Sequence, residues 1–183
     1  MVVAVLLAIL WGIQLADSLD HYSLLRFGIA PRRLDRLGDI FSAPLLHVGW
    51  GHLADNTVPL AILGFIAALA GLIRFLGVSF VIVVVSGLGV WVTAAGGTDT
   101  VGASGLIFGY FGYLVVRGIF DRRLVDVGVG LVVGILYWSI LAGALPGRAG
   151  VSWQAHLFGL LGGVLAAGVF HRRQRQKTAA SPG

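Results

Sequence analysis

Four polar side chains stand near the starts of three long apolar runs, and their types suit acyl transfer. Ser104 heads the run that extends to about residue 116, His156 opens another, and His52 with Asn56 opens a third. A serine becomes a nucleophile when a histidine takes its proton, and imidazole or amide donors can stabilise the oxyanion that forms. The set therefore indicates a serine-dependent reaction centre, provided that the runs bring these groups together.

The residues around Ser104 permit close packing. Gly102 and Gly105 flank the serine and allow unusual backbone angles and close approach. Gly105, Gly109 and Gly112 are spaced four and three apart, so in a helix they form a smooth ridge on one face. The alternative is a serine that only packs against a neighbouring membrane helix. Position 106 is leucine, so the G-x-S-x-G elbow of α/β-hydrolases is absent.

His156 lies on a face of small residues. Gly159 and Gly163 follow it by three and seven positions, which places them on the face of the histidine. Such a face can pack against the glycine ridge of the serine-bearing run and bring the imidazole within hydrogen-bond reach of Ser104. The alternative is a histidine that bonds only to a neighbouring backbone carbonyl.

His52 and Asn56 are four residues apart, hence on one helix face, and both can donate hydrogen bonds to an oxyanion. His47, five residues before His52, is interpreted as a brace for the loop. A metal site made of His47, His52 and His156 is a weaker alternative, because the chain has no glutamate and no H-E-x-x-H pattern. We expect no metal.

No carboxylate is well placed as the third member of a triad. Asp126 falls near the inner end of the fifth apolar run, and Asp17, Asp20 and Asp99 fall in or near loops. Since the acid of a triad mainly orients the histidine, tight helix packing could orient it instead. The sequence therefore predicts a Ser-His dyad.

The composition is that of a membrane protein. Of 183 residues, 57% are hydrophobic and 11% are charged, against about 25% charged residues in soluble domains. The net charge of +5 comes from short basic clusters between apolar runs, a pattern of membrane topology rather than of nucleic-acid binding. The absence of cysteine excludes disulfides and Cys-ligated metals.

The chain as a whole, residues 1–183, is predicted to form a single all-α membrane domain with six transmembrane helices. The apolar runs cover about residues 1–16, 52–71, 75–95, 102–116, 124–145 and 152–170, each near the ~20 residues that cross a bilayer. The connection 20–50 is expected to be a structured interfacial loop, in which a short amphipathic helix could lie on the membrane. Residues 171–183 form a basic tail.

Basic residues near the ends of the runs predict the orientation. Eight of them lie on the side of the tail, and five lie on the other side: Arg26, Arg32, Arg33, Arg36 and Arg148. This bias predicts cytoplasmic termini in a bacterial-type plasma membrane. The second, fourth and sixth runs would then all start near the outer face, and so would the polar side chains at their heads.

At these residues the sequence resembles the rhomboid family of intramembrane serine proteases. The matching motifs are H-x4-H-x3-N at His47, His52 and Asn56, G-x-S-G at residues 102–105, and A-H-x2-G-x3-G at residues 155–163. They occur in the family's order, on alternating spans, and the resemblance extends from about residue 27 onward.

The resemblance implies a role for each of these residues. Ser104 would be the nucleophile and His156 the general base and acid, while His52, Asn56 and the Ser104 backbone N–H would form the oxyanion hole. Substrates would be transmembrane or membrane-proximal segments of other membrane proteins in the lipid bilayer, with no cofactor.

Three features depart from the family pattern. Phe108 stands where members often have a tyrosine that stacks on the catalytic histidine, and it could stack but not donate. Asp55 replaces a bulky apolar residue at the substrate gate. The first long loop lacks the Trp-Arg pair of many members.

Two other functions compete with proteolysis. One is a non-catalytic rhomboid-fold protein that binds membrane clients, against which the intact Ser104 and His156 argue. The other is a small transporter or channel, which would need polar residues along a path across the bilayer rather than at one end.

Overall fold

The computed structural model describes residues 1–147 and 150–179, with side chains through His171. Arg148, which entered the orientation argument, and residues 180–183 of the predicted tail lie outside the described residues. Within them the chain forms only α-helices and 3-10 helices and no β-strand, which confirms the all-α prediction. An isolated bridge joins Ile29 to Thr100.

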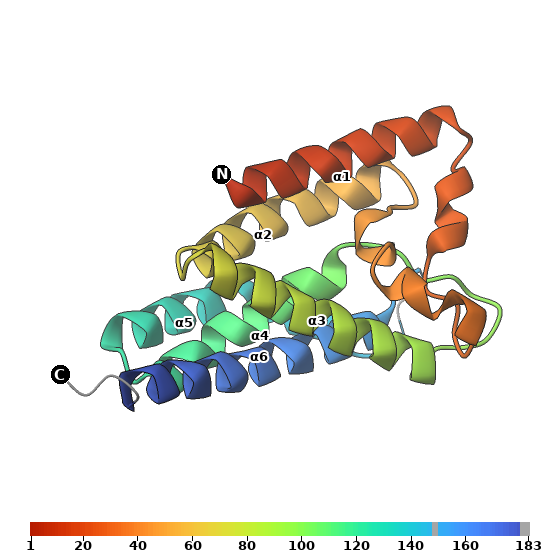
Figure 1. The fold of residues 1–183 in the computed structure, drawn as a ribbon. Coiled ribbons are helices and arrows are strands. Elements are labelled where there is room, and N and C mark those ends of the chain that lie inside the picture. The colour runs from red at the N-terminus through yellow and green to blue at the C-terminus, as the bar shows by residue number, and fades with distance from the viewer. Residues whose placement is uncertain (148–149, 180–183) are drawn as a thin grey trace.

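Six α-helices form the bundle (Figure 1). They are α1 (Val2–Leu19), α2 (Trp50–Ala68), α3 (Leu72–Thr93), α4 (Ser104–Asp121), α5 (Leu124–Tyr137) and α6 (Trp153–Ala179). The 3-10 helices are η1 (Ser23–Phe27), η2 (Leu34–Ile40), η3 (Ala43–Leu45) and η4 (Trp138–Ala144).

Four helical segments of the described chain are long and apolar enough to cross a membrane: Val2–Leu19, Leu72–Thr93, Leu124–Ala144 and Trp153–His171. The helices α2 and α4 have 19 and 18 residues but carry more polar side chains, including Asp55 and Asn56 in α2 and Arg117 and Asp121 in α4. The segments support an integral membrane protein. The count of six spans stays a prediction.

The connection between α1 and α2 is ordered by polar contacts. The segment folds into three short 3-10 helices, η1, η2 and η3, each of seven residues or fewer, and its position at the membrane stays a prediction. Arg36 holds the connection together: its guanidinium donates to the Gly28 carbonyl at 2.8 Å and pairs with Asp39 at 2.8 Å.

The helix α4 is the centre of the bundle. It packs on α6, α5, α2 and α3, and Figure 1 shows α3, α4 and α6 side by side. The glycine faces predicted from the sequence meet: a Cβ on Gly163 would lie 2.7 Å from the Gly109 carbonyl carbon, and one on Gly159 would lie 3.0 Å from the Gly105 carbonyl carbon. The backbones of α4 and α6 are therefore in direct contact.

A partly buried network of polar side chains joins the helices at the end of the bundle where α4 ends. Asp121 of α4 pairs with Arg74 of α3 at 2.9 Å, with Arg117 at 3.3 Å, and with His171 of α6 at 3.2 Å. Arg117 also pairs with Asp126 of α5 at 3.0 Å. The network therefore ties four helices together and leaves Asp126 far from the predicted site.

Candidate active site

Ser104 is the first residue of α4. The preceding segment is fixed by Gly102, whose φ of +123° lies in a region that favours glycine, and whose N–H donates to the Ala43 carbonyl at 2.9 Å. Backbone N–H groups in the first turn of a helix have no partner within the helix and carry partial positive charge. The Ser104 N–H is therefore available to an anionic ligand atom.

The imidazole of His156 is held on two sides. Its Nδ1 lies 2.8 Å from the Gly143 carbonyl oxygen in η4. Because a carbonyl only accepts, Nδ1 must carry the proton, and Nε2 is left as the basic nitrogen. The ring also stacks on Phe108, with centroids 4.0 Å apart and planes 9° apart. Phe108, one turn after Ser104 in α4, therefore stacks on the imidazole as expected from the sequence.

Gly105, which follows Ser104 in α4, lies against Ala155, which precedes His156 in α6. A Cβ on Gly105 would lie 3.4 Å from the Ala155 carbonyl oxygen. Among the described residues, Ser104 Oγ forms no hydrogen bond, so the predicted bond to His156 is not made in this state. Catalytic hydrogen bonds often tighten only when substrate binds, and the dyad stays a prediction.

His52 and Asn56 both lie against the backbone just before Ser104. A Cβ on Gly102 would lie 3.0 Å from His52 Nε2 and 3.8 Å from Asn56 Nδ2, so only glycine leaves room for these side chains. Asn56 is 7% exposed, and its Nδ2 has no hydrogen-bond partner in the described part of the chain. The arrangement leaves an amide donor available beside Gly102, two residues before Ser104, and an oxyanion hole needs such a donor.

His47 braces the segment that carries Ser104. His47 is buried, and its Nε2 accepts a hydrogen bond from the Ala103 N–H at 3.3 Å. Its ring also packs edge-on against the ring of His52, with the two ring centroids 5.0 Å apart. Burial, together with the neighbouring His52, lowers the pKa of His47 to about 4. The ring is therefore neutral near pH 7, which its acceptor role requires.

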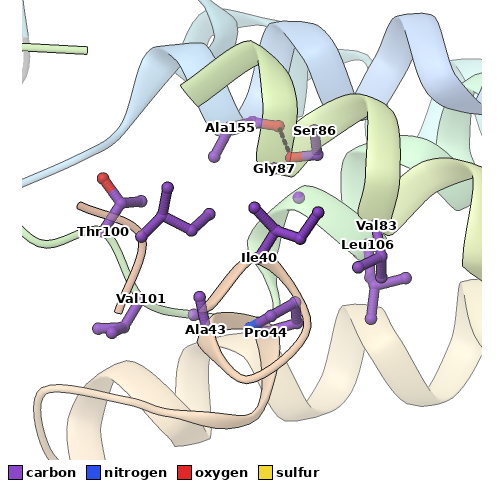
Figure 2. A pocket seen from close by; sticks show the side chains of 13 residues that line it. Ile40, Ala43, Pro44, Val83, Ser86, Gly87, Thr100, Val101, Leu106 and Ala155 are labelled. Carbon is purple, nitrogen blue, oxygen red and sulfur yellow. Dashed lines mark hydrogen bonds between the residues drawn. The ribbon is translucent and has the colours of Figure 1, made fainter. Parts of the chain in front are cut away.

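Two cavities adjoin this region. One, of about 300 Å³, lies beside His52 between the segments 94–101 and 150–154. The other is the pocket of Figure 2, which lies under η3 and against Gly102 and Gly105, and in which Ser86 donates to the Ala155 carbonyl at 2.9 Å. Its space for water is about 20 Å³, enough for a single molecule. Only the first cavity can admit part of a peptide.

The geometry does not favour the alternative metal site. His47 Nε2 accepts the Ala103 N–H, so Nδ1 of the neutral ring carries the proton and His47 has no free nitrogen for a metal. Across the residues that the structure describes, no group of three or more His, Cys, Asp or Glu side chains could hold a metal ion.

Sequence reasoning missed Gly143. The residue contributes only its carbonyl oxygen and a lack of side chain: a Cβ there would lie 3.0 Å from Phe108 and 3.1 Å from His156 Nδ1. A small residue in the run after α5 was the one available signal, and it is weak among 28 glycines.

Comparison with known proteins gives one family. Residues 35–173 match the family described as Rhomboid domain. The chain is 44% identical over 180 residues to the uncharacterized protein Rv1337 of Mycobacterium tuberculosis, covering 94% of this chain and 75% of that protein. It is 41% identical over 181 residues to the uncharacterized protein ML1171 of Mycobacterium leprae, covering 94% and 72%. It is 31% identical over 151 residues to YdcA of Bacillus subtilis, a protein provisionally named a rhomboid protease, covering 81% and 72%.

Proposed function

The chain belongs to the rhomboid family, and on that premise we propose that it is an intramembrane serine endopeptidase. Its substrates would be transmembrane or membrane-proximal segments of other membrane proteins. The observation that carries the proposal is the state of His156, whose Nδ1 bonds to the Gly143 carbonyl and so leaves Nε2 basic, while its ring stacks on Phe108, one turn after Ser104 in α4.

In the first half of the reaction, Ser104 Oγ attacks the carbonyl carbon of the scissile peptide while His156 Nε2 takes the hydroxyl proton. The negative charge that develops on the carbonyl oxygen is stabilised by the Ser104 backbone N–H, His52 and Asn56. When the tetrahedral intermediate collapses, the C–N bond breaks and the leaving amine takes the proton from His156. An acyl ester on Ser104 remains.

In the second half, a water molecule attacks the ester carbonyl and gives a proton to Nε2 of His156. Collapse breaks the bond to Ser104 Oγ, which recovers its proton from the imidazole. The cavity of about 300 Å³ beside His52 provides a route for this water. The products are a free carboxyl, a free amine and the original enzyme.

The membrane arrangement belongs to the same proposal. All six helices would cross the bilayer as a single domain with both termini in the cytoplasm, so that the starts of α2, α4 and α6 lie near the outer face. The basic residues of the tail would then lie on the cytoplasmic side.

The competing function is a rhomboid-fold protein that binds membrane clients without cleaving them. The bond between His156 and the Gly143 carbonyl is compatible with either function. What favours catalysis is that the chain carries both a serine and a histidine, Ser104 and His156, on the two packed helices α4 and α6. The buried Asn56 Nδ2, which has no hydrogen-bond partner among the described residues and lies beside Gly102, also favours catalysis over simple binding.

The test is cleavage of a transmembrane peptide by the full chain in proteoliposomes. We expect Ser104→Ala and His156→Ala to abolish cleavage while the protein stays folded. Asn56→Ala should slow it by about 10²-fold or more, the usual effect of losing one oxyanion donor. Turnover retained by purified Ser104→Ala would refute the proposed nucleophile.

A further inference from the structure

Among the residues that the structure describes, one exposed carboxylate has no hydrogen-bond or ion-pair partner. The chain has eight acidic residues, all aspartate. Seven bond to a backbone N–H, a hydroxyl or an arginine: Asp17, Asp20, Asp35, Asp39, Asp99, Asp121 and Asp126. Asp55 alone forms no hydrogen bond or ion pair with any described residue.

Asp55 lies on the border between two faces of α2. Val58 and Ile62, three and seven residues on and therefore in one stripe with it, are 61% and 41% exposed and face outward from the bundle. His52, three residues before, and Asn56, the next residue, turn toward Gly102 and the start of α4. A segment that approaches along the outward stripe therefore meets the Asp55 carboxylate before it meets the oxyanion donors.

The fold itself gives Asp55 little stabilisation. It is the sixth residue of α2, which begins at Trp50, and the favourable effect of a helix N-terminus on an acid falls off within the first turn. An ionisable group within a membrane-embedded helix is costly unless it serves a function or finds a partner. The Asp55 carboxylate is exposed, and its electrostatic neighbour is the imidazole of His52, with which it forms no ion pair. The carboxylate is therefore accessible to a cation on an approaching segment.

We infer that Asp55 is a specificity-determining residue that pairs with a lysine or arginine of the substrate, close to the scissile bond. The inference rests on the proposed function. Consecutive Cα atoms are about 3.8 Å apart, so the carboxylate and the Asn56 amide lie at the same depth. The substrate cation must therefore be within about one helical turn of the carbonyl that Ser104 attacks.

The experiment compares matched peptides within each enzyme. The probes are synthetic transmembrane peptides with an Ala-Gly centre and one Lys, Gln or Glu at each of eight positions around it. Full-length wild type, Asp55→Asn and Asp55→Lys are reconstituted with them. Asp35→Asn is the control, since Asp35 is an exposed carboxylate paired with Arg33 in the connection between α1 and α2.

We expect wild type and the Asp35→Asn control to favour Lys over Gln in kcat/KM by about 2- to 5-fold at one or two adjacent positions, the range for an exposed ion pair. This ratio should fall to about 1 in Asp55→Asn, and Glu should be favoured over Gln in Asp55→Lys. A wild-type ratio of 1 at every position, or a lysine preference that persists in Asp55→Asn, would overturn the inference.

A binding experiment separates this inference from the proposed function. Fluorescence anisotropy measures the affinity of the same labelled peptides for Ser104→Ala and for Ser104→Ala/Asp55→Asn, neither of which needs to cleave. If no peptide is cleaved by wild type, the protease proposal fails, and the ratio of Lys to Gln affinities decides the role of Asp55. A ratio that Asp55→Asn abolishes supports the role, and a ratio of 1 in both proteins refutes it.

Discussion

Replacing Gly163 with alanine should separate α6 from α4 and destabilise the protein. The added Cβ would lie 2.7 Å from the Gly109 carbonyl carbon and 2.8 Å from the Tyr113 nitrogen, and closer still to the Gly109 carbonyl oxygen. Ordinary contact begins at 3.4 Å, so the helices must move apart by at least 0.7 Å (3.4 − 2.7). The three atoms that the new Cβ would meet all belong to the backbone of α4, so no side-chain rotation can relieve the clash.

The matched control is Gly168→Ala on the same helix. A Cβ there would lie 3.9 Å from the Phe120 ring, which is ordinary contact. Both substitutions gain the same intrinsic helix propensity, about 1 kcal/mol, so their difference isolates the clash. Overpacking of this kind costs about 1–3 kcal/mol, and we expect the free energy of unfolding of Gly163→Ala to be lower than that of Gly168→Ala by that amount.

The assay is equilibrium unfolding of the two variants in the same detergent, followed by peptide cleavage at a temperature where both are folded. Gly163 lies seven residues after His156, about 10 Å along the helix, and a misplacement of about 1 Å near a reacting group can cost 10²-fold in rate. Gly163→Ala should therefore also lose activity. Equal stability and equal rates for the two variants would refute the direct backbone contact between α4 and α6.

Two further predictions concern charge. Asp121→Asn should lower the free energy of unfolding by about 1.5–3 kcal/mol, the usual contribution of a hydrogen bond to a charged group, because it removes the carboxylate that Arg74 and Arg117 share. Asp126→Asn, which leaves Asp121 in place, should cost less, and equal losses in chemical unfolding would contradict this order. His47 has a pKa of about 4 in the folded protein and about 6.5 in the unfolded chain. Between pH 4 and pH 6.5 the unfolded chain therefore binds more protons than the folded protein. The free energy of unfolding should fall as the pH drops from 6.5 to 4. His47→Gln should lose that part of the pH dependence in thermal unfolding, and an unchanged slope would show that His47 does not carry it.

Local spacing was sufficient to predict which side chains share a helix face. The interval from Gly159 to Gly163 predicted a small-residue face on α6, and the structure places that face against Gly105 and Gly109. Such intervals work because the helical repeat converts sequence distance directly into direction. The same reasoning brought His52 and Asn56 to one face, and the structure has both beside Gly102.

Contacts that depend on the backbone or on long sequence separations could not be predicted. The partner of His156 is a main-chain carbonyl of Gly143 in η4, and every residue has a carbonyl, so no residue type marks it. Likewise, Arg74 and Asp121 are 47 residues apart, and nothing local indicates that they pair. The helical run 124–145 changes from α to 3-10 geometry at Trp138, and its apolar composition gives no sign of the change.

The most direct test of the protease proposal is fluorophosphonate labelling of the purified, detergent-solubilised protein, followed by peptide mass mapping. The proposal predicts an adduct on Ser104 that is lost in His156→Ala, because only a hydroxyl activated by the imidazole reacts readily. A folded protein that stays unlabelled while an active rhomboid protease labels in parallel, or an adduct on another serine, would contradict it.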